Sequence, residues 1–176
     1  MSASQILPRV ALALCLTALL TTTAVGRAVA ATDERDVPRI VSFGGLCANC
    51  DLAGRKLTGA RFMGASFTNA SLVGADLRGA SFFGANFSGA DLTKADLRGA
   101  QITALPLGPG RSTPASLAQA RLRYAQAQAA DFSGANLEGA DLRGADFSGA
   151  NVTGAMLRGA DISAVTGLDL GLDLDD

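Results

Sequence analysis

Large apolar side chains recur every five residues through most of the chain. Eighteen units have Leu, Phe, Ile or Val at the centre, with centres running from Leu52 to Ile102 and again from Phe132 to Ile162. Ala stands two places before the centre in 16 of the 18 units, Gly stands two places after it in 14, and Asp or Asn directly precedes it in 11. A period of five fits neither an α-helix, with about 3.6 residues per turn, nor a flat strand, whose side chains alternate.

The glycines indicate where the chain turns. A helix with Gly at every fifth position would lose about 1 kcal/mol per Gly relative to Ala, whereas a turn with positive φ accepts Gly without a steric penalty. Each unit is therefore predicted to be a short extended piece followed by a turn. Because residues two apart share a face of an extended piece, the Ala and the apolar centre point inward, and the Asp or Asn between them points outward.

The units A-D-L-R-G, A-N-F-S-G, A-D-F-S-G and A-N-L-E-G are similar to those of the pentapeptide repeat family, over residues 50–104 and 130–164. The resemblance implies an all-β fold, a right-handed quadrilateral β-helix (a solenoid) in which four units make one coil. Residues twenty apart then stack, which places Phe62 against Phe82 and Phe67 against Phe87. Some members of this family mimic DNA and protect a topoisomerase (gyrase) from inhibitors.

Residues 105–129 interrupt the repeat between its first block (50–104) and its second block (130–164). The stretch from Thr103 to Pro114 is rich in Pro and Gly and is typical of a loop. Residues 115–129 contain strong helix formers and no Gly, with Thr113 as a helix N-cap and Pro114 at the first helical position, so a short helix is predicted. The alternative is a degenerate extra coil, because Leu117 and Leu122 keep the five-residue frame.

The two ends of the chain have compositions of their own. Residues 1–30 are typical of a cleaved signal peptide, with Arg9 ahead of an apolar run and A-V-A at 28–30, so the mature chain is predicted to begin at Ala31 and to be periplasmic or secreted. No membrane span is expected after cleavage. Residues 31–49 are predicted to form a leader and an N-terminal cap. Residues 165–176 are an acidic C-terminal tail that caps the coils or supports dimerisation through this end.

Composition narrows the chemistry of the chain. The 176 residues carry a net charge of −1, and 48% are hydrophobic against 18% charged, so the chain is neither disordered nor suited to binding nucleic acid. There is no His, which excludes Ser-His-Asp and Cys-His sites and removes the commonest nitrogen ligand of metals. We therefore expect no catalytic residues, no metal and no cofactor, and we predict that the protein is not an enzyme.

Cys47-Ala48-Asn49-Cys50 is the one motif with redox chemistry. A thioredoxin-like site needs C-x-x-C at the start of a helix, and a zinc site needs about four ligands. Here the motif opens a β-repeat, and with no His and no further Cys in the mature chain there are only two such ligands. In an exported chain the two cysteines are predicted to form a local disulfide at the cap, and a thiol–disulfide function is the alternative.

Two apolar residues project outward twenty positions apart. Met63 and Phe83 each follow an apolar centre, so they fall in one outward column and form a candidate surface for a protein partner. The outward Asp and Asn side chains are instead expected to bond to the backbone at the turns. The favoured function is a non-catalytic, exported rod for protein interaction or scaffolding in the cell envelope. The DNA-mimicking gyrase-protection protein is the alternative that the family resemblance supplies.

Overall fold

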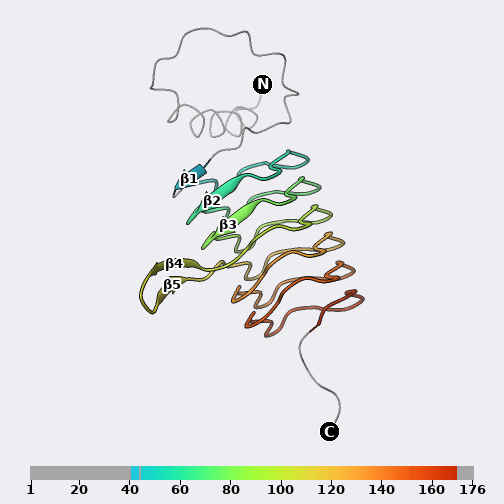
Figure 1. The fold of residues 1–176 in the computed structure, drawn as a ribbon. Helices are drawn as coiled ribbons and strands as arrows, with labels where there is room; N and C mark the ends of the chain where they lie inside the picture. The colour runs from blue at the N-terminus through green and yellow to red at the C-terminus, as the bar shows by residue number, and fades with distance from the viewer. Residues whose placement is uncertain (1–40, 44, 170–176) are drawn as a thin grey trace, which may run out of the picture.

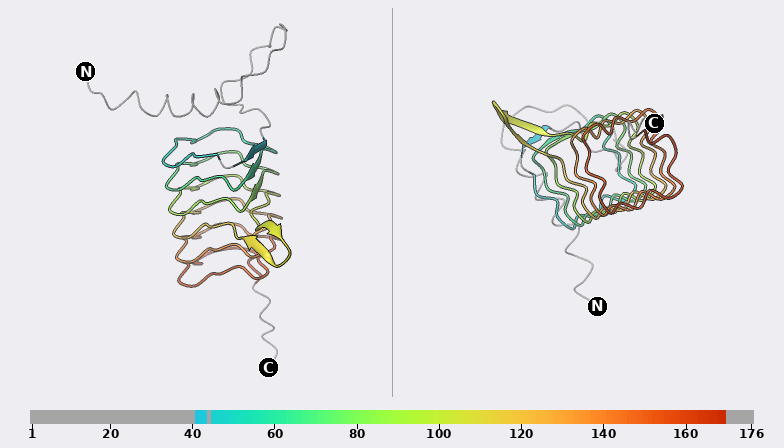
Figure 2. Two further views of the ribbon diagram at one scale, coloured as in Figure 1. Left: turned by 90° about the vertical axis from the view of Figure 1, so that its left-hand side faces the viewer. Right: turned by 90° about the horizontal axis from the view of Figure 1, so that it is seen from below.

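The computed structural model describes residues 41–43 and 45–169, with side chains from residue 45 onward. The predicted signal peptide (1–30), most of the leader (31–40) and the last tail residues (170–176) lie outside the described residues. The described chain winds into stacked coils of four short sides, so that it is quadrilateral when seen along the stack (Figures 1 and 2). In residues 80–99 the sides are 80–84, 85–89, 90–94 and 95–99, and we call them faces 1 to 4.

Backbone hydrogen bonds join each coil to its neighbours. Strands β1 (Val41–Phe43), β2 (Arg61–Met63) and β3 (Ser81–Phe83) form a parallel sheet on face 1, with partners twenty residues apart. Single parallel bridges continue the same pairing on the other faces, such as Asp51 with Ser71 and Asp76 with Asp96. The prediction of an all-β, right-handed quadrilateral β-helix is confirmed.

A turn at the end of most units explains the five-residue period. In the unit centred on Leu72, the N–H of Ala75 donates to the carbonyl of Leu72 at 3.0 Å, and Gly74 between them has φ of +62°. A four-residue turn with positive φ at its third position is the type II turn, which favours Gly there. The N–H of Leu72 meanwhile donates to the carbonyl of Asp91 in the next coil at 2.7 Å.

The inward side chains form the core. The centres and the Ala positions are almost all buried from Leu52 to Phe147. The rings of Phe62 and Phe82 stack with centroids 5.2 Å apart, and those of Phe67 and Phe87 with centroids 4.8 Å apart. Both predicted stacks are confirmed. The two stacks also meet edge to face, with 5.0 Å between the centroids of Phe82 and Phe87, a geometry that adds about 0.5–1.5 kcal/mol per pair beyond burial.

The predicted helix at 115–129 is wrong, and the alternative of an extra coil is correct. These residues continue the ladder, and pairing of Ser116 with Asn86 shows a register of thirty residues, so that ten residues are inserted in this coil. Leu117 and Leu122 are fully buried. Helix propensity is a weak preference that tertiary contacts override, and here hydrogen bonds to coils on both sides and the burial of two Leu side chains outweigh it. The second block of coils therefore begins at residue 115, not 130.

The missing glycines made this segment resemble a helix. Its turn positions are taken by Gln119, Tyr124 and Ala129, with φ of +60°, +56° and +55°. A non-Gly residue in this left-handed region costs about 1 kcal/mol. Tyr124 is 62% exposed, and its ring lies over Gly144 of the next coil.

The ten inserted residues form a hairpin that stands out from the coils (Figure 1). Strands β4 (Leu105–Gly108) and β5 (Arg111–Thr113) are antiparallel. The hairpin base lies on Gly84, which is buried: a Cβ at this residue would be 2.7 Å from the Cβ of Leu105 and 3.2 Å from the carbonyl oxygen of Thr113. A side chain at residue 84 would therefore push the hairpin away from face 1.

We expect Gly84→Ala to loosen the hairpin and Gly79→Ala to leave it in place. Both glycines have φ of +61°, but nothing lies within 4 Å of a Cβ at Gly79. Each variant should lose about 1 kcal/mol from backbone strain, and Gly84→Ala about 1–3 kcal/mol more from overpacking. Urea unfolding measures the free energies, and the rate of trypsin cleavage after Arg111 reports on the hairpin. Equal cleavage rates in the two variants would contradict the docking of the hairpin on Gly84.

Candidate interaction surface

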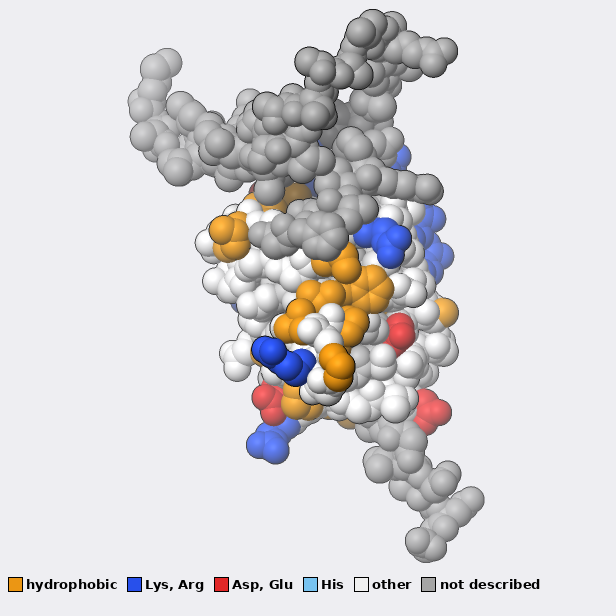
Figure 3. Space-filling view, turned by 60° about the vertical axis from the view of Figure 1, so that its left-hand side comes forward, with side chains coloured by type: hydrophobic (Ala, Val, Ile, Leu, Met, Phe, Trp, Pro, Cys, Tyr) orange, Lys and Arg blue, Asp and Glu red, His pale blue; other side chains and the backbone are white. Residues whose placement is uncertain are grey.

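The outward apolar column on face 1 lies where the sequence places it. Met63 and Phe83 are partners in the pairing of β2 with β3, and both side chains are half-buried. The hairpin adds Leu105, Pro106 and Leu107 beside them, and apolar side chains gather over this part of the surface (Figure 3). We call Met63, Phe83, Leu105, Pro106 and Leu107 the face-1 patch.

The hairpin residues of the face-1 patch were not predicted. Leu105 reaches back over β2, with its Cδ2 atom 3.9 Å from the position of a Cβ on Gly64, and Leu107 is 55% exposed. The positions of Leu105 and Leu107 depend on the path by which the inserted segment leaves and rejoins the coils. The five-residue period does not predict this path. The only signal in the sequence was the pair of Leu residues in a segment otherwise rich in Pro and Gly.

The outward Asp and Asn side chains serve the turns, as predicted. In all eleven units with Asp or Asn before the centre, its side-chain oxygen accepts a hydrogen bond from the backbone N–H two residues later, at 2.9–3.3 Å. Each carboxylate therefore already has a structural partner. Among the described residues no group of three or more His, Cys, Asp or Glu could hold a metal ion.

Arginines neutralise several of these carboxylates on faces 3 and 4. Arg78 binds Asp76 through two nitrogen atoms, at 2.8 and 2.7 Å, and its Nε also lies 3.6 Å from Asp96 of the next coil. Arg98 makes the same bidentate contact with Asp96. The hydrogen bond from Arg78 lowers the pKa of Asp76 to about 2, and that from Arg98 lowers the pKa of Asp96.

A second ladder of ion pairs lies further along face 3. Asp141 accepts hydrogen bonds from both Arg143 and Arg123, and the Arg143 bond is the main cause that lowers the pKa of Asp141. Arg143 also lies 3.4 Å from Asp161 in the next coil. Oppositely charged side chains of neighbouring coils thus form direct pairs, and the solenoid has no uniformly acidic face in this region.

Two arginines beside the face-1 patch differ from the arginines of the ion-pair ladders. Arg61 begins β2, two residues before Met63, and Arg111 begins β5, opposite Gly108. Both are exposed, and neither has an ion pair or a side-chain hydrogen bond with the described part of the chain.

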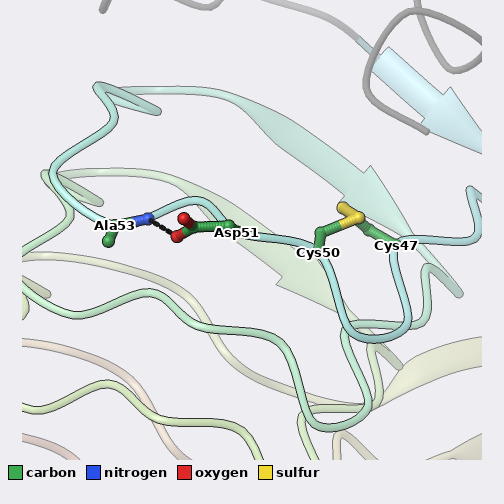
Figure 4. The surroundings of a disulfide bond; sticks show 4 residues. All are labelled: Cys47, Cys50, Asp51 and Ala53. Atoms are coloured by element: carbon green, nitrogen blue, oxygen red, sulfur yellow. Dashed lines mark hydrogen bonds between the residues drawn. A yellow bond between two sulfur atoms is a disulfide. The ribbon is translucent and has the colours of Figure 1, made fainter. Parts of the chain in front are cut away.

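Cys47 and Cys50 lie at the N-terminal end of the coils and are joined as a disulfide, with their Cα atoms 5.2 Å apart (Figure 4). Both side chains are partly buried and pack against the core. The next turn follows at once, where Asp51 accepts the N–H of Ala53. A loop this short removes only about 2 kcal/mol of chain entropy from the unfolded state, so the bond fixes the first coil rather than holding the fold.

The C-terminal end of the described coils exposes apolar side chains. A groove of about 430 Å³ is lined by Ala150, Val152, Leu157 and Asp169 among others, and Ile162 on the same coil is 43% exposed. This is the end through which dimerisation is predicted.

No helix in the described part of the chain has the length and hydropathy that crossing a membrane requires.

We expect the ion-pair ladders to make stability depend on pH only in acid. The pKa of Asp76 is about 2 in the folded chain and about 3.9 when unfolded, so its contribution is present above about pH 4 and is lost as the pH falls toward 2. Urea unfolding should give a constant free energy between pH 7 and 5 and a decline below pH 4. The Asp76→Asn variant should decline less, because the titrating group is gone; an unchanged decline would contradict this assignment.

A family model described as pentapeptide repeats matches eight copies in this chain, over residues 47–82, 72–104, 115–138 and 128–163. A comparison with curated protein sequences finds no match. Among solved structures, the chain is similar to HetL from the cyanobacterium Nostoc, a pentapeptide repeat protein involved in heterocyst differentiation regulation. Identity is 27%, coverage is 75% of this chain and 68% of HetL, and the TM-score is 0.30.

Two other solved structures are similar. Rfr23, a pentapeptide repeat protein from the cyanobacterium Cyanothece, is 21% identical over 76% of this chain and 91% of its own, with a TM-score of 0.45. QnrB1, a plasmid-mediated fluoroquinolone resistance protein, is 25% identical over 76% of this chain and 72% of its own, with a TM-score of 0.37. These low TM-scores carry no argument about function. The family match, however, covers well over half of the chain, and its stretches lie on either side of the hairpin, so the chain belongs to the pentapeptide repeat family.

Proposed function

We propose that this chain is an exported, non-catalytic protein that acts as a rigid rod for protein interaction in the cell envelope, with the face-1 patch as its binding surface. The observation that carries the proposal is the patch itself. Met63 and Phe83 are fixed by strand pairing, and the hairpin that adds Leu105 and Leu107 is held against the buried Gly84. Exposed apolar clusters on a soluble protein mark interaction sites more often than scattered apolar residues do.

The use of the acidic side chains supports a non-catalytic role. General acid–base catalysis needs a carboxyl group whose protonation changes near the working pH. The outward carboxylates accept turn hydrogen bonds, and arginines lower the pKa of Asp76, Asp96 and Asp141, so these groups stay ionised and occupied. Arginine pairing on faces 3 and 4 also argues against the DNA-mimicking alternative, which needs a strongly acidic surface.

The signal-like residues 1–30 support export, and the C-x-x-C pair supports an oxidising destination. The apolar side chains at the last coil, such as Leu157 and Ile162, support association of two chains through that end. We expect the structural disulfide, rather than thiol–disulfide exchange, to account for Cys47 and Cys50.

Fractionation of the native host tests the localisation. We expect the chain outside the cytoplasm, beginning at Ala31 by N-terminal sequencing, with a mass two hydrogens lower than that of the dithiol form. A full-length chain in the cytoplasm would contradict export, and a supercoiling assay with gyrase would then test the alternative.

Site-specific crosslinking in the host tests the interaction. A photoreactive benzophenone amino acid replaces Phe83 in one variant and Val73 in a matched control, since Val73 is 37% exposed and holds the equivalent outward position on face 3. We expect a discrete crosslinked product at residue 83 and none at residue 73. The same products at both positions, or none at residue 83, would contradict a binding role for the face-1 patch.

A further inference from the structure

The charges beside the face-1 patch restrict what it can bind. Apolar groups in a binding interface are matched by apolar groups, while each charged group that loses water needs a partner of opposite sign. Arg61 and Arg111 have no such partner in the described structure, unlike Arg78, Arg98 and Arg143, which bind Asp side chains. A segment that covers the patch therefore has to bring its own negative charge.

The positions of the two arginines define the arrangement. Arg61 and Met63 both point outward from β2, two residues apart, and Arg111 lies opposite Gly108 next to Leu107 on the hairpin. One guanidinium that is unpaired within the described residues thus adjoins an apolar side chain on the sheet, and the other adjoins one on the hairpin. Phe83 is the strand partner of Met63, and Leu105 lies close to Gly84, the residue after Phe83. Met, Phe and Arg are also side chains that are enriched in protein interfaces.

In the described part of the chain, the column of Arg61 brings no acidic residue close to it. In the column of Arg61, the next levels carry Ser81 and Gln101, and the first acidic residue is Asp131, three coils away. The Oδ1 atom of Asp131 already accepts hydrogen bonds from the N–H of Ser133 and from the side chain of Asn151. Among the described residues, the charge next to the patch is therefore positive.

We infer that the face-1 patch binds an acidic segment of another protein in which Asp or Glu residues alternate with large apolar residues. This inference rests on the proposed function and names the partner's chemistry. The apolar side chains cover Phe83, Leu105 and Leu107, and the carboxylates bind the guanidinium groups of Arg61 and Arg111, where two-pronged pairing is available. Attraction between the charges makes the complex sensitive to salt.

A synthetic peptide with this pattern tests the inference. The fluorescent probe is L-D-L-G-L-D-L-D-D, which has the sequence of residues 168–176, and its anisotropy is measured with the mature chain. We expect saturable binding that weakens with salt. Phe83→Ser and Arg111→Glu should each weaken binding at least tenfold, whereas Val73→Ser and Arg158→Glu, which change an exposed apolar and an exposed cationic residue away from the patch, should leave it unchanged. A peptide with Lys in place of Asp should not bind.

Three results would overturn the inference. Binding that Phe83→Ser and Arg111→Glu leave unchanged would move the site elsewhere. If the peptide binds only to a chain in which Leu170, Leu172 and Leu174 are replaced by Ser, the chain's own C-terminal segment competes for the patch and is its occupant. Sedimentation with anionic phospholipid vesicles that requires Phe83 and Arg111, with no peptide binding, would assign it to a lipid surface.

The crosslinking experiment separates this inference from the proposed function. A specific product at residue 83 together with no peptide binding would leave the binding surface in place and reject the acidic partner. No product at residue 83 would reject the surface itself.

Discussion

The structure depends on the backbone hydrogen bonds between coils. They require residues of successive coils to stay in register, and this is possible only if the chain turns at the same place in every unit. The ladder is less demanding about which side chain fills the interior. Ala127 occupies a position that is Leu in the coils before it. Its N–H nevertheless donates to the backbone carbonyl of Asp146 at 2.7 Å, as the N–H groups of the other centres do to the next coil. The apolar core stabilises the coils, and the ladder sets their shape.

Most of the fold was predictable from the sequence because one short period determines both the turns and the inward positions. The Phe stacks and the outward Met63 and Phe83 follow from counting twenty residues. The helix at 115–129 was wrong because residues such as Gln119 and Tyr124 are good or neutral in helices and unusual at positive φ. A residue's own preference is small beside the hydrogen bonds that two neighbouring coils impose on it.

Only part of the candidate site could be predicted from the sequence, for a related reason. Met63 and Phe83 belong to the repeat, whereas Leu105, Leu107 and Arg111 belong to the inserted segment. Their neighbours were set by the close approach of Leu105 and Thr113 to Gly84, a contact between segments that no period encodes. The charges divide in the same way. Arginines inside the repeat, such as Arg78, pair with carboxylates of their own coil and the next, whereas Arg111 in the insertion has no carboxylate partner among the described residues.

The hairpin leaves and rejoins the solenoid at a single corner. Just before the hairpin, the N–H of Ile102 donates to the backbone carbonyl of Asp131 in the next coil. Just after it, the N–H of Ser116 donates to the backbone carbonyl of Ala85 in the preceding coil, so the ladder continues unbroken across the insertion. The coils therefore impose no particular length or sequence on the inserted segment beyond its base at Gly84. Evolution can exchange that segment while the rod is inherited unchanged, and a protein engineer can use the same corner to graft new loops.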